Sequence, residues 1–238
     1  EMELSNGDAP LTSGLSGQLE LRLPRQQAGT ATGSLELQLH RPQWQDLSIN
    51  ELQLKLPYRL NYPLLDFQLQ GSVPETDIRF SSKGKFDLTR QQLKSQWLLP
   101  PVAIQPLTAL LPASSNLLNQ DIAIESGTLS AAASLNGRFN KAPIWQADAD
   151  IGITGLNINL PGWSLIDTKS ALQLNISHKQ PINGHGVLGI SRVDGAVPMQ
   201  KITAIASLKP TQRQAFEVHQ ASVELLGGRL FADPFELT

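Results

Sequence analysis

The sequence predicts an all-β protein, with a long, strongly curved antiparallel sheet that forms an open groove and one short helix near residues 106–111. Two observations carry the fold class. Apolar and polar residues alternate through most of the 238 residues, which is the period of half-buried strands. Glycine and proline separate the alternating stretches, as they do between the strands of a β-meander.

The groove is predicted from the longest alternating stretch, SGTLSAAASLNGRF at residues 126–139. Its odd-numbered positions from Leu129 to Leu135 are apolar, whereas most of the intervening ones are polar, so one face of an extended strand is apolar. At ~3.3 Å per residue the stretch would span ~46 Å, far more than a usual strand of about 5 to 6 residues. Alanines stand where a packed core would have larger side chains, so we expect a shallow groove wall.

The first half of the chain contains further alternating stretches. Leu47 and Ile49 precede Leu52, and this change of parity requires a tight turn or a bulge at Asn50 and Glu51. Ser82-Lys83-Gly84 is expected to be the turn of a hairpin. The strands are expected around residues 17–23, 34–40, 52–56, 65–69, 78–80, 86–88 and 93–99.

The middle of the chain differs, because Pro106 stands at a plausible helix start and Leu107, Leu110 and Leu111 have helical spacing. The alternative is an irregular proline-rich loop. Alternation then resumes, giving about fifteen strands in all. In this half they are expected around residues 122–139, 147–153, 156–160, 172–176, 188–190, 202–208, 216–218 and 223–225.

The expected organisation is a flexible or irregular start at residues 1–16, followed by a single continuous groove segment at 17–238 with halves of about 17–105 and 120–238. The chain opens without a signal-peptide pattern and ends in the strand-like PFELT, which indicates a piece of a longer protein. Asp233-Pro234 places the terminal strand, 229–237, at a sheet edge, because proline cannot donate to a ladder. We expect the next segment of the longer protein to continue the sheet there; the alternative is a turn that ends the domain.

Composition argues against several partners and chemistries. A formal net charge of -2, without a lysine and arginine stripe, is not that of a nucleic-acid-binding protein. The chain has no cysteine, so it has no disulfide framework, no thiolate chemistry and no cysteine metal site.

Candidate catalytic and metal motifs are weak. GHGVLG at residues 184–189 matches G-x-G-x-x-G, but a strand pattern follows it where a nucleotide site needs a helix. Asp148 and Asp150 share one face of a strand and fit a solvated outer face better than a cation or acid–base pair. The four histidines are scattered. We therefore expect no enzyme activity, no metal site and no cofactor.

The candidate site is instead the apolar lining of the groove. Its members share a position on the apolar side of an alternating stretch in the second half of the chain. They are Leu129, Ala131, Ala133, Leu135, Ala149, Ile151, Leu172, Leu174, Ile202, Ala204, Ala206, Val223 and Leu225.

Two stretches carry a family resemblance, VELLGGRLFADPF at 223–235 and IESGTLS at 124–130 after the leucine- and proline-rich segment. From about residue 104 to its end the chain resembles YdbH-type proteins of the AsmA-like superfamily, bacterial relatives of the bridge-like lipid transfer proteins. The resemblance implies a periplasmic protein, anchored in the inner membrane, whose curved β-groove moves phospholipid to the outer membrane with a small outer-membrane lipoprotein. This chain lacks the anchor and is too short to cross an envelope, so it would be a segment of such a bridge.

Two other classes stay open. An extracellular adhesin or carbohydrate-binding β-sandwich would use Trp44, Trp97, Trp145 and Trp163 as sugar platforms, although aromatic residues make up only 5% of the chain. A purely structural β-scaffold would close its apolar face into a core. Whether the apolar face is a filled core or an open trough distinguishes these alternatives.

Overall fold

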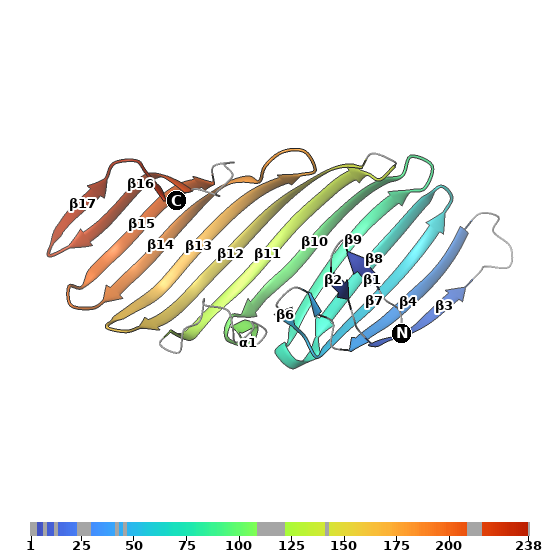
Figure 1. Ribbon diagram of the computed structural model, residues 1–238, viewed down its shortest axis with the longest axis horizontal. Helices are drawn as coiled ribbons and strands as arrows, with labels where there is room; N and C mark the ends of the chain where they lie inside the picture. Colours follow the sequence, from blue (N-terminus) through green and yellow to red (C-terminus); the bar gives the residue numbers. More distant parts are fainter. Residues whose placement is uncertain are drawn as a thin grey trace. The chain divides into compact units, whose positions relative to one another are not determined.

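The structure, a computed structural model, describes residues 4–6, 9–11, 14–22, 30–40, 43–44, 47–108, 122–140, 143–208 and 216–237. These residues form an antiparallel all-β fold with almost no helix, which confirms the predicted class (Figure 1). The helix expected at 106–111 corresponds to α1 (Gln105–Thr108), and residues 109–111 lie outside the described part. A short 3₁₀ helix, η1, spans Pro74–Thr76.

None of the described helices has the length and apolar character that crossing a membrane requires.

The chain divides into two compact units. The first unit contains Glu1–Pro100, Pro106–Ser114 and Ser134–Trp145. The second contains Pro101–Gln105, Ser115–Ala133 and Gln146–Thr238.

In the first unit the strands pair in chain order, each antiparallel to the next. The order is β3 (Gly14–Arg22), β4 (Thr30–His40), β7 (Glu51–Asn61), β8 (Leu64–Val73), β9 (Ile78–Asp87) and β10 (Gln92–Ala103). Two small pairs accompany them, β1 (Leu4–Asn6) with β2 (Ala9–Leu11) and β5 (Gln43–Trp44) with β6 (Leu47–Ser48). The first pair and the start of β3 lie where an irregular start was expected. A bend at Asn50, between β6 and β7, accommodates the parity change expected there.

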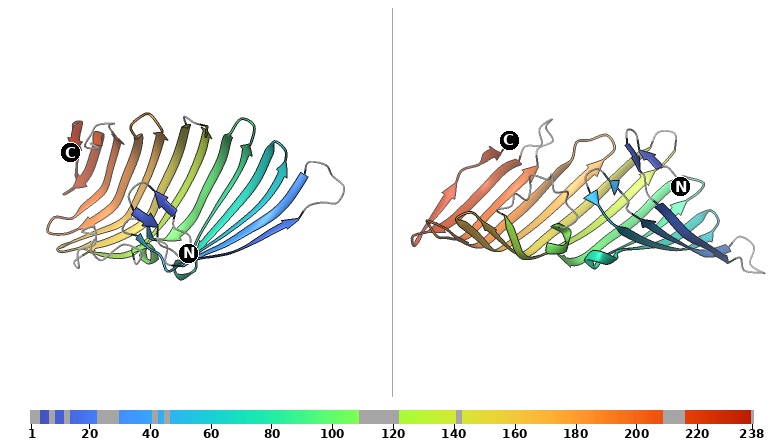
Figure 2. Two further views of the ribbon diagram at one scale, coloured as in Figure 1. Left: turned by 45° about the vertical axis from the view of Figure 1, so that its right-hand side comes forward. Right: turned by 60° about the horizontal axis from the view of Figure 1, so that its bottom comes forward.

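In the second unit the strands also follow chain order, and Figure 2 shows β13 to β16 side by side. The order is β12 (Ile144–Leu160), β13 (Trp163–Ser177), β14 (Asn183–Asp194), β15 (Met199–Leu208), β16 (Phe216–Leu225) and β17 (Gly228–Ala232). β18 (Phe235–Leu237) pairs with β16 as β17 does, so Asp233-Pro234 interrupts an edge strand, as predicted. β11 (Ala123–Arg138) has residues in both units, and its 16 residues confirm the predicted long strand.

One predicted turn is wrong. Ser82-Lys83-Gly84 lies inside β9, which is a single strand, because Ser82 pairs with Leu69 and Gly84 pairs with Phe67 on the neighbouring β8. Glycine is needed at position 84 because its neighbours leave no room for a side chain, and not because the chain turns there. A Cβ atom at this position would lie 2.6 Å from the carbonyl oxygen of Lys94 and 2.6 Å from the Phe67 ring.

Each face of the first unit has its own chemistry. Leu35 lies opposite Leu56, and Tyr58 lies opposite Phe67, on one face. On the other face Glu36 forms an ion pair with Lys55, at 2.7 Å from carboxylate to ammonium. The alternation predicted from the sequence is thus realised across neighbouring strands.

The apolar face has hardly any fully buried side chains. Among the residues that the structure describes, the buried apolar side chains are Val73, Ile78, Val102, Val193 and Val218, and none is large and completely enclosed. The other apolar residues of the strands are mostly half-buried. A β-sandwich would bury both inner faces between two sheets about 10 Å apart.

Replacing Gly84 with alanine tests the close packing between strands. The added methyl group must displace the Lys94 backbone and the Phe67 ring, so we expect about 1–3 kcal/mol of destabilisation, measured by urea denaturation. Gly189→Ala is the matched control, because no atom lies within 4 Å of the Cβ position. Equal stability of the two variants would contradict the register of β8, β9 and β10.

Candidate functional site

The candidate residues of the second unit lie on one face of its sheet. Ala149 pairs with Leu174 and Ile151 with Leu172, which places β12 and β13 residues side by side. On β14, Gly186 lies between Leu172 and Ala206 in register. The same alternation puts the remaining β11, β15 and β16 candidates on this face, apart from Leu135, which belongs to the first unit.

This apolar face is partly exposed. All thirteen predicted residues are half-buried, so none is sealed in a core and none is fully solvated. Leu188 and Ile190 of β14 complete the face, being paired with Ala204 and Ile202, and were omitted from the candidate site. The alternation of Leu188 and Ile190 along β14 is the sequence signal from which both could have been included in the candidate site.

Bulges keep the apolar residues on the same face. On β12 they occupy odd positions up to Ile153 and even positions from Leu156, a change that would turn them to the other side of a regular strand. Gly155 between them has φ of +61°, and the register with β13 shifts at this point. The extra residue restores the original face. Residues 147–153 and 156–160 therefore belong to one strand. From the sequence, two strands were predicted.

The same device recurs on neighbouring strands. Asp167 on β13 has φ of +50° and Lys201 on β15 has φ of +47°, each at a change of parity in its strand. The register between β15 and β16 also shifts between Gln200 and Thr203. On β11, Gly127 has φ of +143° and separates Ile124 from the odd-numbered series that begins at Leu129. The bulges thus occur on several adjacent strands.

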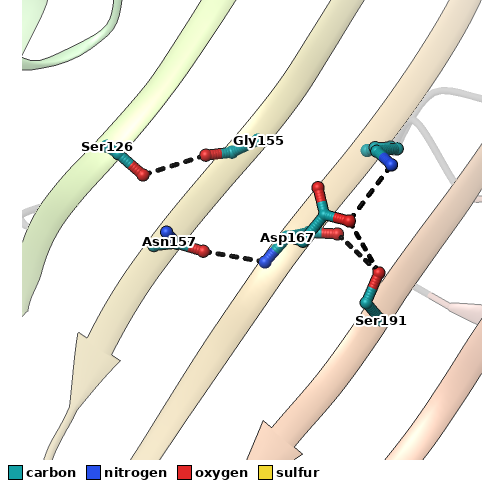
Figure 3. Close-up of polar contacts among 6 residues, drawn as sticks. Ser126, Gly155, Asn157, Asp167 and Ser191 are labelled. Atoms are coloured by element: carbon teal, nitrogen blue, oxygen red, sulfur yellow. Dashed lines mark hydrogen bonds and ion pairs between the residues drawn. The ribbon is translucent and has the colours of Figure 1, made fainter.

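Polar side chains hold this bulged region, as Figure 3 shows. Ser126 Oγ donates to the Gly155 carbonyl oxygen at 3.0 Å. The Asp167 backbone N–H donates to Asn157 Oδ1 at 2.7 Å, which satisfies a group at the bulge. Ser191 Oγ donates to Asp167 Oδ2 at 2.8 Å, and Lys169 Nζ lies 3.1 Å from the same oxygen. These contacts connect four successive strands, β11 to β14.

The Asp167 carboxylate is stabilised by these donors. The hydrogen bond from Ser191, followed by that from Lys169, lowers the pKa of Asp167 below its ordinary value. Asp167 therefore has a structural role at the bulge. We assign it no part in catalysis.

Thr168 is a polar exception on the apolar face. Its side chain is buried, and its hydroxyl has no hydrogen-bond partner among the residues that the structure describes. It lies in register with Leu156 on one side and Ile190 on the other. The sequence signal that could have singled it out is the interruption of the β13 leucine pattern by Thr168 and Ser170.

The weak catalytic and metal motifs occupy ordinary strand positions. Asp148 and Asp150 pair with Asn175 and Gln173 on the polar face, and Asn175 Nδ2 donates to Asp148 Oδ1 at 2.6 Å. The G-x-G-x-x-G match lies within β14, with no helix after it. Within the described ranges, no three acidic or histidine side chains gather in a group that could hold a metal ion.

Two cavities among the described residues each reach the predicted lining at a single residue. One of about 470 Å³ lies beside the β16–β17 turn, with only Leu225 of the predicted set at its wall. Another, of about 740 Å³, belongs to the first unit and includes only Leu135 of that set. The candidate site is thus a continuous apolar surface rather than an enclosed pocket.

Replacing Ser191 with alanine tests the bulge network. Removing the hydroxyl donor should raise the Asp167 pKa toward its ordinary value, which carboxyl NMR during a pH titration measures. Since the folded-state pKa is lowered, the interaction stabilises the fold above the unfolded-state pKa of about 3.9 and is lost as pH falls through the folded value. Ser170→Ala is the control. An unchanged Asp167 titration in Ser191→Ala would refute the contact.

Comparisons with protein-family models, with curated proteins and with solved structures find no match to this chain.

Proposed function

We propose that this chain binds lipid acyl chains along its apolar sheet face and lets them slide without catalysis, as a segment of a lipid-transport protein. The single observation that carries the proposal is the apolar face from β12 to β16, which is continuous in register and only half-buried. We propose further that the sheet curves around this face to form an open groove.

The energetics favour such a cargo. An acyl chain of about sixteen carbons gains ~13 kcal/mol on leaving water, at ~0.8 kcal/mol per methylene. Desorption of a lipid through water is slow for the same reason. A continuous apolar surface lowers that barrier without a reactive group, and it leaves the chain free to move because the contacts are non-directional.

Small side chains give the face room for a cargo. Ala131, Ala133, Ala149, Ala204 and Ala206 stand where leucine or isoleucine would fill the space above the sheet. Larger residues flank them in register, for example Leu174 beside Ala149 and Leu188 beside Ala204. An acyl chain would lie over the alanines and contact these larger neighbours.

The resemblance to YdbH-type proteins supplies the proposed setting. The cargo would be phospholipid moving between the two membranes of a bacterial envelope, and the site of action would be the periplasm. An inner-membrane anchor and a small outer-membrane lipoprotein would complete the bridge. The protein would need neither a metal nor a cofactor, and it would not be an enzyme.

The rival functions have less support. A carbohydrate-binding sandwich needs a closed apolar core, whereas few described apolar side chains are buried. Of its proposed platforms, Trp97 and Trp163 are each 38% exposed, and the Trp163 ring lies against Gly195, where an added Cβ atom would be 2.3 Å from a ring carbon. A structural scaffold would likewise enclose its apolar face.

Mass spectrometry of organic extracts from the purified protein tests the cargo directly. We expect phospholipid in stoichiometric amount, retained through gel filtration in detergent-free buffer. A lipid-free protein that also fails to take up fluorescent phospholipid from vesicles would overturn the proposal.

A pair of neighbouring substitutions tests which face carries the lipid. Ala133→Asp should abolish uptake of fluorescent phospholipid, because an unpaired charge on an apolar surface costs several kcal/mol to desolvate. Ala132→Asp is the matched control, since the adjacent side chain is exposed on the opposite face. Ala204→Arg should behave like Ala133→Asp. Circular dichroism checks that all three variants fold, and uptake by both face variants at the control level would contradict the assignment.

A further inference from the structure

Exposed apolar side chains gather along one edge of the first unit, where successive turns meet. The Leu88 N–H donates to the Pro63 carbonyl oxygen at 2.9 Å, which joins the β9–β10 turn to the β7–β8 turn. The Phe139 N–H donates to the Gln91 carbonyl oxygen at 2.7 Å, which joins the end of β11 to the β9–β10 turn. These turns therefore form one continuous rim, along the upper edge in Figure 1.

Several side chains of this rim are apolar and exposed. Their exposed fractions are 69% for Tyr62, 42% for Leu64, 40% for Leu88, 41% for Phe139 and 58% for Ile144. A single exposed leucine needs no explanation, but a contiguous apolar group marks an interaction site.

The polar face beside the rim is basic. Arg59, Lys83, Lys85 and Lys94, with Asp66 as the acidic side chain among them, form a basic patch on neighbouring strands β7 to β10. Strand alternation puts these five on the face opposite Tyr58 and Phe67. The row Arg59–Asp66–Lys85–Lys94 lies two residues, or ~7 Å, from the residues at the strand ends.

Charge in this region is not balanced from within. Lys85 lies directly opposite Lys94, an arrangement that destabilises a strand pair. Lys85 reaches Asp66 at 3.4 Å, and Arg90 in the β9–β10 turn reaches Asp87 at 3.8 Å. Together with Arg138 at the end of β11, the region contains six basic and two acidic residues. The basic ones are Arg59, Lys83, Lys85, Arg90, Lys94 and Arg138, and the acidic ones are Asp66 and Asp87. The local charge is therefore +4, in a chain of formal charge -2.

We propose that this region docks on the surface of an anionic lipid bilayer. The apolar rim would enter the boundary between headgroups and acyl chains, where tyrosine and other amphipathic side chains are favoured. The basic patch would face the phosphates, whose negative potential offsets the repulsion between the lysines. An apolar edge flanked by positive charge fits this partner better than a protein surface, because it matches both layers of the membrane interface.

Docking is separate from the proposed binding of acyl chains. The basic patch and the rim belong to the first unit, whereas the proposed acyl-chain face, β12 to β16, belongs to the second. A membrane can therefore be bound whether or not lipid occupies the apolar face. The Ala133→Asp variant should keep its affinity for vesicles.

Co-sedimentation with extruded vesicles tests the docking. Vesicles of phosphatidylglycerol and phosphatidylcholine should bind the protein, vesicles of phosphatidylcholine alone should bind it far more weakly, and added salt should weaken the first interaction. The double variant Lys85→Gln/Lys94→Gln should bind anionic vesicles roughly tenfold or more weakly, since each basic residue near such a surface contributes about a fivefold factor. Tyr62→Ser/Phe139→Ser should also lose binding.

Matched variants outside the region serve as controls. Leu226→Ser removes an apolar side chain that is 87% exposed in the β16–β17 turn, and Lys169→Gln/Lys179→Gln removes two exposed lysines of the second unit. Both should bind as the unmodified protein does. The proposal fails if the unmodified protein does not bind anionic vesicles, which is the result expected if the region binds a protein partner instead. It also fails if the control substitutions weaken binding as much as the substitutions in the rim and the basic patch.

Discussion

The structure depends on one constraint, that the apolar side chains of many strands stay on the same side of a sheet. A β-strand alternates its side chains strictly, so a single change of parity turns every later residue to the other face. In the second unit β12, β13 and β15 each contain such a change, and each has a residue with positive φ at that point: Gly155, Asp167 and Lys201. The bulges correct the parity. They also bend the strands, because a bulge increases the local twist and tilts the strand.

A sheet built in this way has little core to stabilise it. Few described apolar residues are fully buried, so cross-strand pairs and the backbone ladder carry most of the stability. The exposed ion pairs, such as Lys55 with Glu36, contribute little because water screens them. Close contacts between strands then matter more. Phe67 lies over Gly84 and Phe80 lies over Gly71, so aromatic rings take the space that a second layer would fill elsewhere.

The same property connects stability with the proposed function. A half-buried apolar face is costly in water, and a bound acyl chain removes that cost, so the cargo would also stabilise the protein. The two faces can then have separate partners. In our proposals the apolar face takes the lipid tails, whereas the polar face and the rim of the first unit take the membrane surface.

The sequence by itself determined the strand class, the apolar and polar sides of each strand, and the edge position of Asp233-Pro234, because these depend on local alternation and on the missing proline donor. From the sequence, Gly84 suggested a turn at Ser82-Lys83-Gly84, and the change of parity suggested that β12 is two strands. Both predictions were wrong, because the structural effect of a glycine or of a parity change depends on the neighbouring strand. Only the tertiary structure decided the register that pairs Gly84 with Phe67 and the bulge that keeps β12 whole. It also assembled the basic patch, whose charges come from β7, β8, β9 and β10 and are scattered in the chain. Register is a non-local property, because it is set by the fit between side chains of different strands. The residue pattern of one strand therefore does not specify which residues of the next strand lie opposite it.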